Sequence, residues 1–232
     1  MPSEMDRQDA RQQLERLIHR AVVGYALRCA LRVWGLIPQA LQNRGILDQN
    51  RSHINAIKFA LRVTWDYVNR IAIDAEDLRR TEVQTRATCH SLDEVAIVKP
   101  QVRNSFYLPP ARVITPLPEE VQAGLKSLLA AVRAASQAAQ CIAEYGDHGV
   151  ASMALEAETW SLAAEPKAKG AAKSDLEHFA AEWSITPPTK KDAAPVMPKF
   201  DKPILFEDWP LYPHAIPGWF QDAMKDGWVL PH

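Results

Sequence analysis

Apolar residues recur at three- and four-residue intervals through most of the N-terminal part of the chain, as they do along one face of a helix. Ser3, with Asp6 three residues later, is typical of a helix start. The periodic pattern then continues to Trp34, where Gly35 and Pro38 interrupt it. The sequence therefore predicts one long first helix from Ser3 to Trp34.

The same periodicity indicates further helices later in the chain. After a loop around Gly45, Ser52 is suited to cap a second helix that runs towards Leu92, with a candidate break near Asp74. Pro118 followed by two acids is a typical helix opening, and residues 119–164 are rich in alanine, the strongest helix former. Glycines at 146 and 149 would split that region into two helices.

Prolines mark the boundaries between these parts. Residues 94–118 carry five prolines, which predicts an ordered crossover loop rather than a helix. Residues 165–173 have the small and polar side chains of a flexible link. We therefore expect an all-α helical bundle or array of about five helices in residues 1–164, a linker at 165–173, and a C-terminal extension at 174–232.

The extension is rich in aromatic residues, whereas disordered tails are poor in them. Its aromatic side chains are separated by prolines, and five of them are candidate partner-binding residues: Trp209, Tyr212, Trp219, Phe220 and Trp228. Two interpretations remain open. The segment packs on the helical domain and completes its core, or it is exposed and anchors a partner protein through its tryptophans.

Composition narrows the classes of function. A hydrophobic content of 47% suffices for a packed core, and 27 Lys and Arg residues nearly balance 28 Asp and Glu residues. That balance argues against binding to DNA or to an anionic membrane through net charge alone. The N-terminus lacks the apolar region of a signal peptide, and no run approaches the length that spans a bilayer. We therefore expect a cytoplasmic protein, and its oligomeric state is left open.

The sequence contains no nucleotide-binding loop and no nucleophile elbow. Its three cysteines are far apart, and its seven histidines show no metal-ligand spacing. Asp147 and His148 form the one conspicuous pair, and the glycines beside them fit a sharp turn better than a catalytic dyad. We expect no cofactor, no metal and no catalysis, although a site assembled from distant helices remains an alternative.

Arginines on the first two helices offer a second kind of surface. Arg28 and Arg32 are four residues apart and therefore share one helix face, so both are candidate partner-binding residues. Similar arginines at 16, 20, 62 and 70 extend the pattern into a basic ridge. Nucleic-acid binding through this ridge is the other alternative, although acids such as Glu15 and Asp66 interrupt it.

The stretch from Tyr25 to Pro38, YALRCALRVWGLIP, followed by the Ala- and Arg-rich helix from Ser52, resembles the opening of certain all-α immunity proteins of bacterial polymorphic-toxin systems. The resemblance covers residues 15–164, including the Ala-rich helix pair. It implies a cytoplasmic protein that binds a toxin or another defence-system component. The Pro-rich crossover and the aromatic segment have no counterpart in it.

Overall fold

The computed structural model describes residues 4–69, 73–93, 117–141, 146–185 and 211. Nearly all of the predicted crossover loop lies outside these ranges. Of the aromatic extension beyond residue 185, Leu211 alone lies within them. The five aromatic residues predicted to bind a partner therefore lie outside the described residues.

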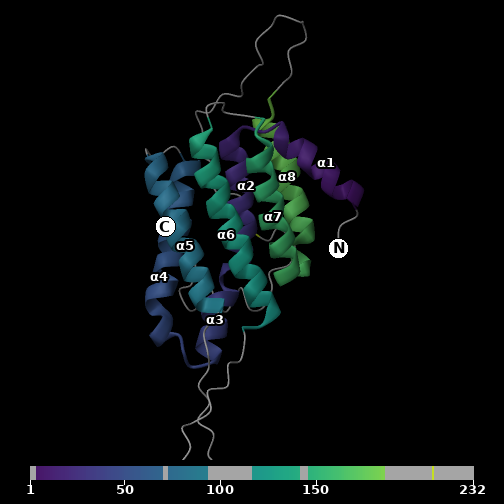
Figure 1. The fold of residues 1–232 in the computed structure, drawn as a ribbon. Helices are drawn as coiled ribbons and strands as arrows, with labels where there is room; N and C mark the ends of the chain where they lie inside the picture. The colour runs from purple at the N-terminus through teal and green to yellow at the C-terminus, as the bar shows by residue number, and fades with distance from the viewer. Residues whose placement is uncertain (1–3, 70–72, 94–116, 142–145, 186–210, 212–232) are drawn as a thin grey trace, which may run out of the picture.

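Within the described residues the fold is all-α, which confirms the predicted class (Figure 1). Its helices are shorter and more numerous than the sequence predicts, and short 3-10 helices at Asp48–Asn50 and Pro166–Ala168 precede two of them. The α-helices are α1 (Glu4–Glu15), α2 (His19–Trp34), α3 (Leu36–Asn43), α4 (Arg51–Val68), α5 (Ala75–Asp93), α6 (Glu119–Gln140), α7 (His148–Ala164) and α8 (Lys169–Trp183).

The predicted first helix is divided into α1 and α2. Leu17 forms an isolated antiparallel bridge with Ser184, and the backbone N–H of Ile185 donates to the Arg16 carbonyl oxygen at 2.8 Å. Ile18 is extended, with φ −69° and ψ 150°. The break contains no proline or glycine, so hydrogen bonding to a segment far away in sequence overrides the local preference for helix.

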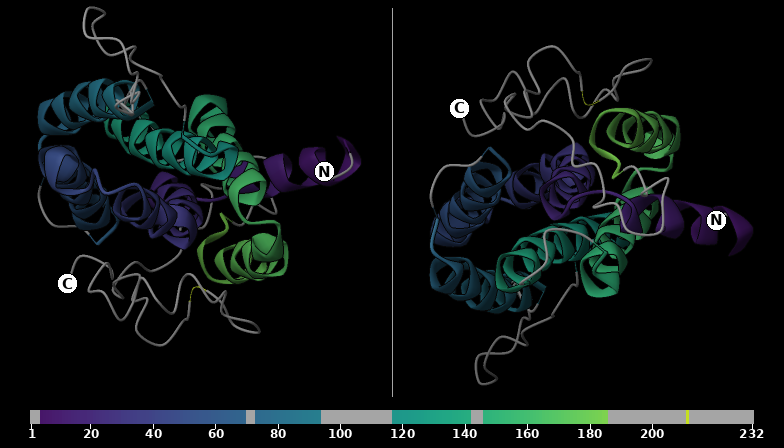
Figure 2. Two further views of the ribbon diagram at one scale, coloured as in Figure 1. Left: turned by 90° about the horizontal axis from the view of Figure 1, so that it is seen from below. Right: turned by 90° about the horizontal axis from the view of Figure 1, so that it is seen from above.

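The long helices run side by side, and α2 and α6 lie in the middle of the array (Figures 1 and 2). The pair α4 and α5 covers one side of them, and α7 and α8 cover the other. α6 contacts α4, α5 and α7, and α2 contacts α4, α7 and α8, so these two central helices together join the two sides. α1 projects outward from the side formed by α7 and α8 (Figure 2).

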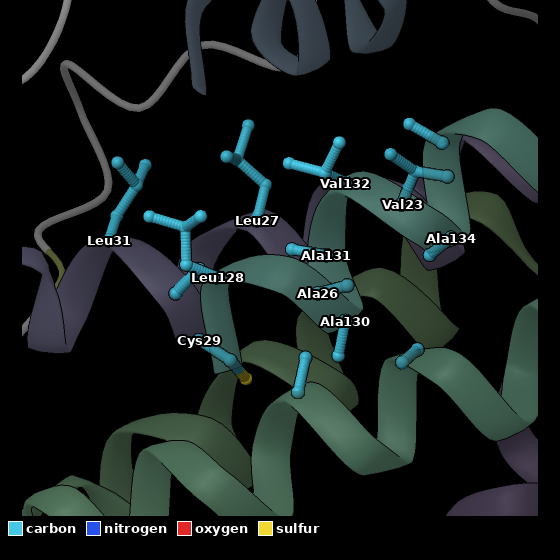
Figure 3. Packing of buried hydrophobic residues seen from close by; sticks show 14 of the residues in the cluster. Val23, Ala26, Leu27, Cys29, Leu31, Leu128, Ala130, Ala131, Val132 and Ala134 are labelled. Atoms are coloured by element: carbon cyan, nitrogen blue, oxygen red, sulfur yellow. The ribbon is translucent and has the colours of Figure 1, made fainter. Parts of the chain in front are cut away.

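Small side chains allow the central helices to approach closely. On α6 the buried positions include Ala130, Ala131 and Ala134, and Figure 3 shows them lying near Ala26 of α2. Larger residues such as Leu27, Leu31, Leu128 and Val132 fill the space beside these alanines (Figure 3). The alanine content of α6 thus provides both helix propensity and tight packing.

The stretch His19–Asn43, which contains α2 and α3, is long and apolar enough to cross a membrane by length and composition alone, with a mean hydropathy of 1.3. However, 94% of its most apolar window is buried inside the fold. The apolar character of this stretch is therefore explained by its position at the centre of the core.

The structure differs from the predicted linker at residues 165–173. Glu165 accepts a hydrogen bond from the backbone N–H of Lys167 at 3.1 Å, a 3-10 turn follows, and α8 begins at Lys169. Ala168, Ala171 and Ala172 are buried. The lysines that suggested a link lie on the exposed face, while the alanines between them pack inward.

Gly124 of α6 offers a test of the central packing. A Cβ atom at this position would lie 3.6 Å from the Val33 carbonyl oxygen and 3.9 Å from Ile37 Cγ1, which are ordinary contacts. We expect Gly124→Ala to raise the free energy of unfolding by about 0.5–1 kcal/mol through helix propensity. Gly124→Leu should lower it, because the added carbons have no space. Denaturant titration measures both.

Gly170 of α8 is the matched control, because nothing lies within 4 Å of its ideal Cβ position. Gly170→Leu should not show the loss of stability expected for Gly124→Leu. Equal losses at the two positions would contradict the close packing of α6 on α2.

Candidate functional site

Two arginines of α2 share one buried carboxylate of α8. Arg28 Nε donates to Asp175 Oδ2 at 2.8 Å and Arg28 Nη2 donates to Oδ1 at 3.0 Å, so this pair is bidentate. Arg32 Nη2 forms a second ion pair with Oδ2. All three side chains are at most 1% exposed. We call Arg28, Arg32 and Asp175 the buried charge cluster.

The cluster also reaches the C-terminal part of the chain. Arg32 Nε donates to the Leu211 carbonyl oxygen at 2.8 Å, and the Leu211 side chain is itself buried. Residues 32 and 211 are 179 positions apart in sequence. One arginine therefore connects α2 both to α8 and to the C-terminal segment at Leu211.

These positions overturn the predicted surface role of Arg28 and Arg32. The spacing correctly places them on one helix face, but that face is turned to the interior and not to solvent. Arg20 is half-buried and donates to the Val68 carbonyl oxygen at 3.3 Å. Arg16 and Arg62 are exposed, whereas Arg70 lies outside the described residues. The predicted ridge is therefore interrupted by buried arginines.

Asp147 and His148 point to different partners, as the turn interpretation requires. Asp147 Oδ1 accepts from the backbone N–H groups of Gly149 and Val150, at 2.6 and 3.0 Å, and caps α7. These bonds, led by that from Val150, lower the pKa of Asp147. His148 Nδ1 lies 2.8 Å from a carboxylate oxygen of Glu15 in α1. The pair thus caps one helix and contacts another.

The cysteine next to the charge cluster is poorly suited to nucleophilic chemistry. Cys29 is fully buried, and burial raises the pKa of its thiol to about 12. The thiolate is the reactive form, so Cys29 remains an unreactive thiol near neutral pH. Among the described residues, no group of three or more His, Cys, Asp or Glu side chains is placed to hold a metal ion.

A pocket of about 440 Å³ lies beside the charge cluster, between α1, α7 and α8, and Tyr25 of α2 forms part of its wall. Its charged lining combines Arg7, Lys169 and Lys173 with Asp9, Glu158 and Glu177. Tyr25 is fully buried, and its hydroxyl has no hydrogen-bond partner. We call this space the Tyr25 pocket.

Glu158 is the acid with the most unusual environment in this pocket. Burial raises its pKa above the ordinary value of 4.5, and the nearby Tyr25 hydroxyl offsets part of that effect. The positive charges of Arg7, Arg32 and Lys169 also act to lower it. The net result is a carboxyl group that holds its proton to a higher pH than an exposed glutamate does.

A second, wider cleft of about 850 Å³ lies on the other side of α1, between α1 and α7. Arg11 and Glu15 line it from α1, and His148 and Trp160 line it from α7. Lys126 Nζ of α6 sits 4.3 Å from the centre of the Trp160 ring. We call this space the α1–α7 cleft. It shares Arg7, Leu155 and Thr159 with the Tyr25 pocket, and Arg7 Nη2 donates to Thr159 Oγ1 at 3.2 Å.

No protein-family model, curated protein or solved structure matches this chain at a significant level. The candidate sites therefore follow from their geometry. Sequence reasoning missed Asp175, Tyr25 and Glu158, because each lies in a helix whose partner helix is distant in sequence. An aspartate among the apolar positions of α8 was the one available signal.

The charge cluster leads to a stability prediction. Asp175→Ala would leave two buried guanidinium groups without their carboxylate, and removing one partner of a buried pair typically costs about 3–5 kcal/mol. We expect a loss of that size in the free energy of unfolding, measured by denaturant titration. Glu177→Ala, which removes an exposed acid two residues away, is the control. Similar losses for the two variants would contradict the role of the cluster.

The raised pKa of Glu158 leads to a prediction about pH. Above pH 4.5 the unfolded chain loses this proton while the folded chain still holds it, so stability falls as pH rises towards the folded-state pKa. Glutamine has no proton to lose in this range, so the stability of Glu158→Gln does not fall in this way. We therefore expect the variant to gain stability relative to the native chain over that window, as measured by thermal unfolding at a series of pH values.

Glu156→Gln, at an exposed position of the same helix, controls for the loss of a surface charge. If the stability of Glu158→Gln relative to the native chain instead fell with rising pH, the pKa of Glu158 would not be raised in the folded chain. That result would rule out the environment described for Glu158.

Proposed function

We propose that this chain is a non-catalytic protein-binding protein that contacts its partner through the α1–α7 cleft and through its aromatic C-terminal segment. The observation that carries the proposal is the cleft itself. It is open and about 850 Å³ in volume, and Arg11 and Trp160 both line it together with polar groups. Arginine and tryptophan are the residues that most often dominate protein–protein binding energy.

The packing of α1 supports this use of the cleft. α1 touches the rest of the fold at α7 and α8, and Leu14 is its fully buried anchor. Arg11 Nε pairs with a Glu15 carboxylate oxygen at 2.8 Å, and the same oxygen contacts His148. These contacts hold the polar rim in place, while Trp160 is half-buried and supported by Lys126. A preorganised surface loses less entropy when a partner binds.

The C-terminal segment supplies the second part of the proposed interface. Leu211 lies between Trp209 and Tyr212 in sequence, and its contact with Arg32 fixes one point of this segment on the fold. Trp219, Phe220 and Trp228 follow within the same segment. Their aromatic side chains provide large contact areas with few rotatable bonds, which suits partner recognition.

The class of partner follows from the resemblance of residues 15–164 to immunity proteins. We propose a toxin or another defence-system protein, bound in the cytoplasm. The cleft mixes Arg7 and Arg11 with Glu15 and Glu156, so it suits a partner surface that carries both signs of charge.

Co-purification from the native host, followed by mass spectrometry, would identify the partner. Its affinity would then be measured with the purified full-length chain and its variants. We expect Arg11→Glu and Trp160→Ala each to weaken binding by roughly tenfold or more, because both residues line the cleft. Trp219→Ala and Trp228→Ala should each weaken binding as well, because both residues belong to the C-terminal part of the proposed interface.

Arg80→Glu is the matched control. Arg80 forms an exposed helical ion pair with Glu76, similar to that between Arg11 and Glu15, but lies on α5 at the opposite side of the molecule (Figure 1). If the partner binds the Arg11, Trp160 and Arg80 variants with equal affinity, the cleft is excluded as its binding site. Failure to recover any protein partner would contradict the proposed function as a whole.

A further inference from the structure

The Tyr25 hydroxyl is an unsatisfied polar group in the interior. The side chain is fully buried, and the oxygen has no hydrogen-bond partner. Leaving a buried hydroxyl unpaired is costly, because the group has lost its hydrogen bonds to water without replacing them. Burial also raises the pKa of Tyr25 well above 10.0, so the hydroxyl keeps its proton and remains available as a donor. The free donor belongs to a residue that lines a pocket.

The neighbours of Tyr25 do not satisfy it, because they are engaged elsewhere. Asp175 is bound by both arginines of the charge cluster. Ser161 donates to the Cys29 carbonyl oxygen at 2.9 Å. The Glu158 carboxyl group is close enough to the hydroxyl for the contact to lower the pKa of Glu158. The two groups nevertheless lack the geometry of a formed hydrogen bond.

The Tyr25 pocket has the size of a small-molecule site. Its volume of about 440 Å³ lies within the usual range for such sites, roughly 300–1,000 Å³. Leu155, Leu162 and Leu176 supply an apolar wall. Polar and charged side chains from different helices converge beside this wall, among them Tyr25 from α2, Glu158 from α7 and Lys169 from α8. An apolar wall next to converging polar groups can orient a ligand that has an apolar body and a charged end.

The charges of the lining select the ligand. Three cations (Arg7, Lys169 and Lys173) face three acids (Asp9, Glu158 and Glu177). If Glu158 binds a proton when the ligand enters, the lining carries one excess positive charge. One excess charge matches a ligand with a single negative charge, and it is too little for a doubly charged phosphate ester.

We propose that the Tyr25 pocket binds a small monocarboxylate with an apolar body, whose carboxylate accepts the hydrogen bond that Tyr25 Oη does not make within the protein. The leucines contact the apolar body, and Arg7 and Lys169 attract the negative charge. Because the hydroxyl oxygen is not exposed to water, the proposal requires a neighbouring side chain to move when the ligand binds, and we expect the half-buried Glu158 side chain to do so. This proposal does not depend on the partner-binding function of the α1–α7 cleft.

The test uses the full-length chain and defined probes. Octanoate is titrated against the protein by calorimetry and by ligand-observed NMR, with octanol and octyl phosphate as the matched neutral and doubly charged probes. We expect octanoate to bind saturably and more tightly than either. Tyr25→Phe should weaken octanoate binding by roughly tenfold or more, because it removes a hydrogen bond to a charged group.

Three further variants separate binding from folding. Tyr25→Phe removes an unsatisfied hydroxyl, so its own stability should be equal to or greater than that of the native chain. Leu162→Trp should block binding by filling the pocket, and Glu158→Gln should preserve or tighten it by removing a negative charge. Tyr67→Phe, on α4 away from the pocket, should leave the affinity unchanged.

Several results would overturn the proposal. These are the absence of saturable octanoate binding, equal affinity for octanol, and an affinity that Tyr25→Phe does not change. A short peptide with a free C-terminal carboxylate that binds more tightly than octanoate would identify the ligand as the end of a protein chain, and would also reject the small-molecule assignment.

Discussion

The structure depends on one carboxylate that compensates two buried guanidinium groups. Removing charges from water costs several kcal/mol for each ion, and only close ion pairs with good geometry offset that cost. Arg28 and Arg32 lie one turn apart on α2, so Asp175 must sit against that turn to reach both. This requirement allows little freedom in the position of α8. Apolar contacts alone would tolerate small shifts, whereas the bidentate pair does not.

The position of α8 determines other features of the fold. Ser184 and Ile185 follow directly after α8, and their backbone contacts with Leu17 and Arg16 interrupt the first helix. Because of that interruption, α1 departs from the axis of α2 and projects from the array (Figure 2). The Tyr25 pocket and the α1–α7 cleft then form on either side of α1. Both candidate sites therefore depend on an ion pair that neither of them contains.

The sequence predicts the helical class but not this arrangement. Periodicity correctly identifies one face of α2 for Arg28 and Arg32, but the period of a helix does not tell which face is covered by another helix. Asp175 is 147 residues from Arg28. No local pattern connects two residues at that distance. The same limit explains the linker prediction, since Lys167 and Lys169 suggested solvent while the neighbouring Ala168 and Ala171 are buried.

The Tyr25 pocket was equally hidden from sequence analysis, for a different reason. A tyrosine within an apolar helix face fits a packed core, and Tyr25 is indeed buried, with its ring 6.4 Å from that of Phe179 in a T-shaped arrangement. What sequence cannot show is whether its hydroxyl finds a partner. In the folded chain the nearby polar groups of α2, α7 and α8 are divided into two sets. The first set consists of Asp175 and Ser161, which are engaged in contacts that hold the helices together.

Tyr25 and Glu158 form the other set. Both line the same pocket, and they lie close to each other without the geometry of a formed hydrogen bond. Either group is more stable with a partner than without one, because a buried polar atom has lost its contacts with water. A phenylalanine at position 25 would fill the same space without the unpaired oxygen, so packing alone does not explain the hydroxyl. A ligand that accepts its hydrogen bond does.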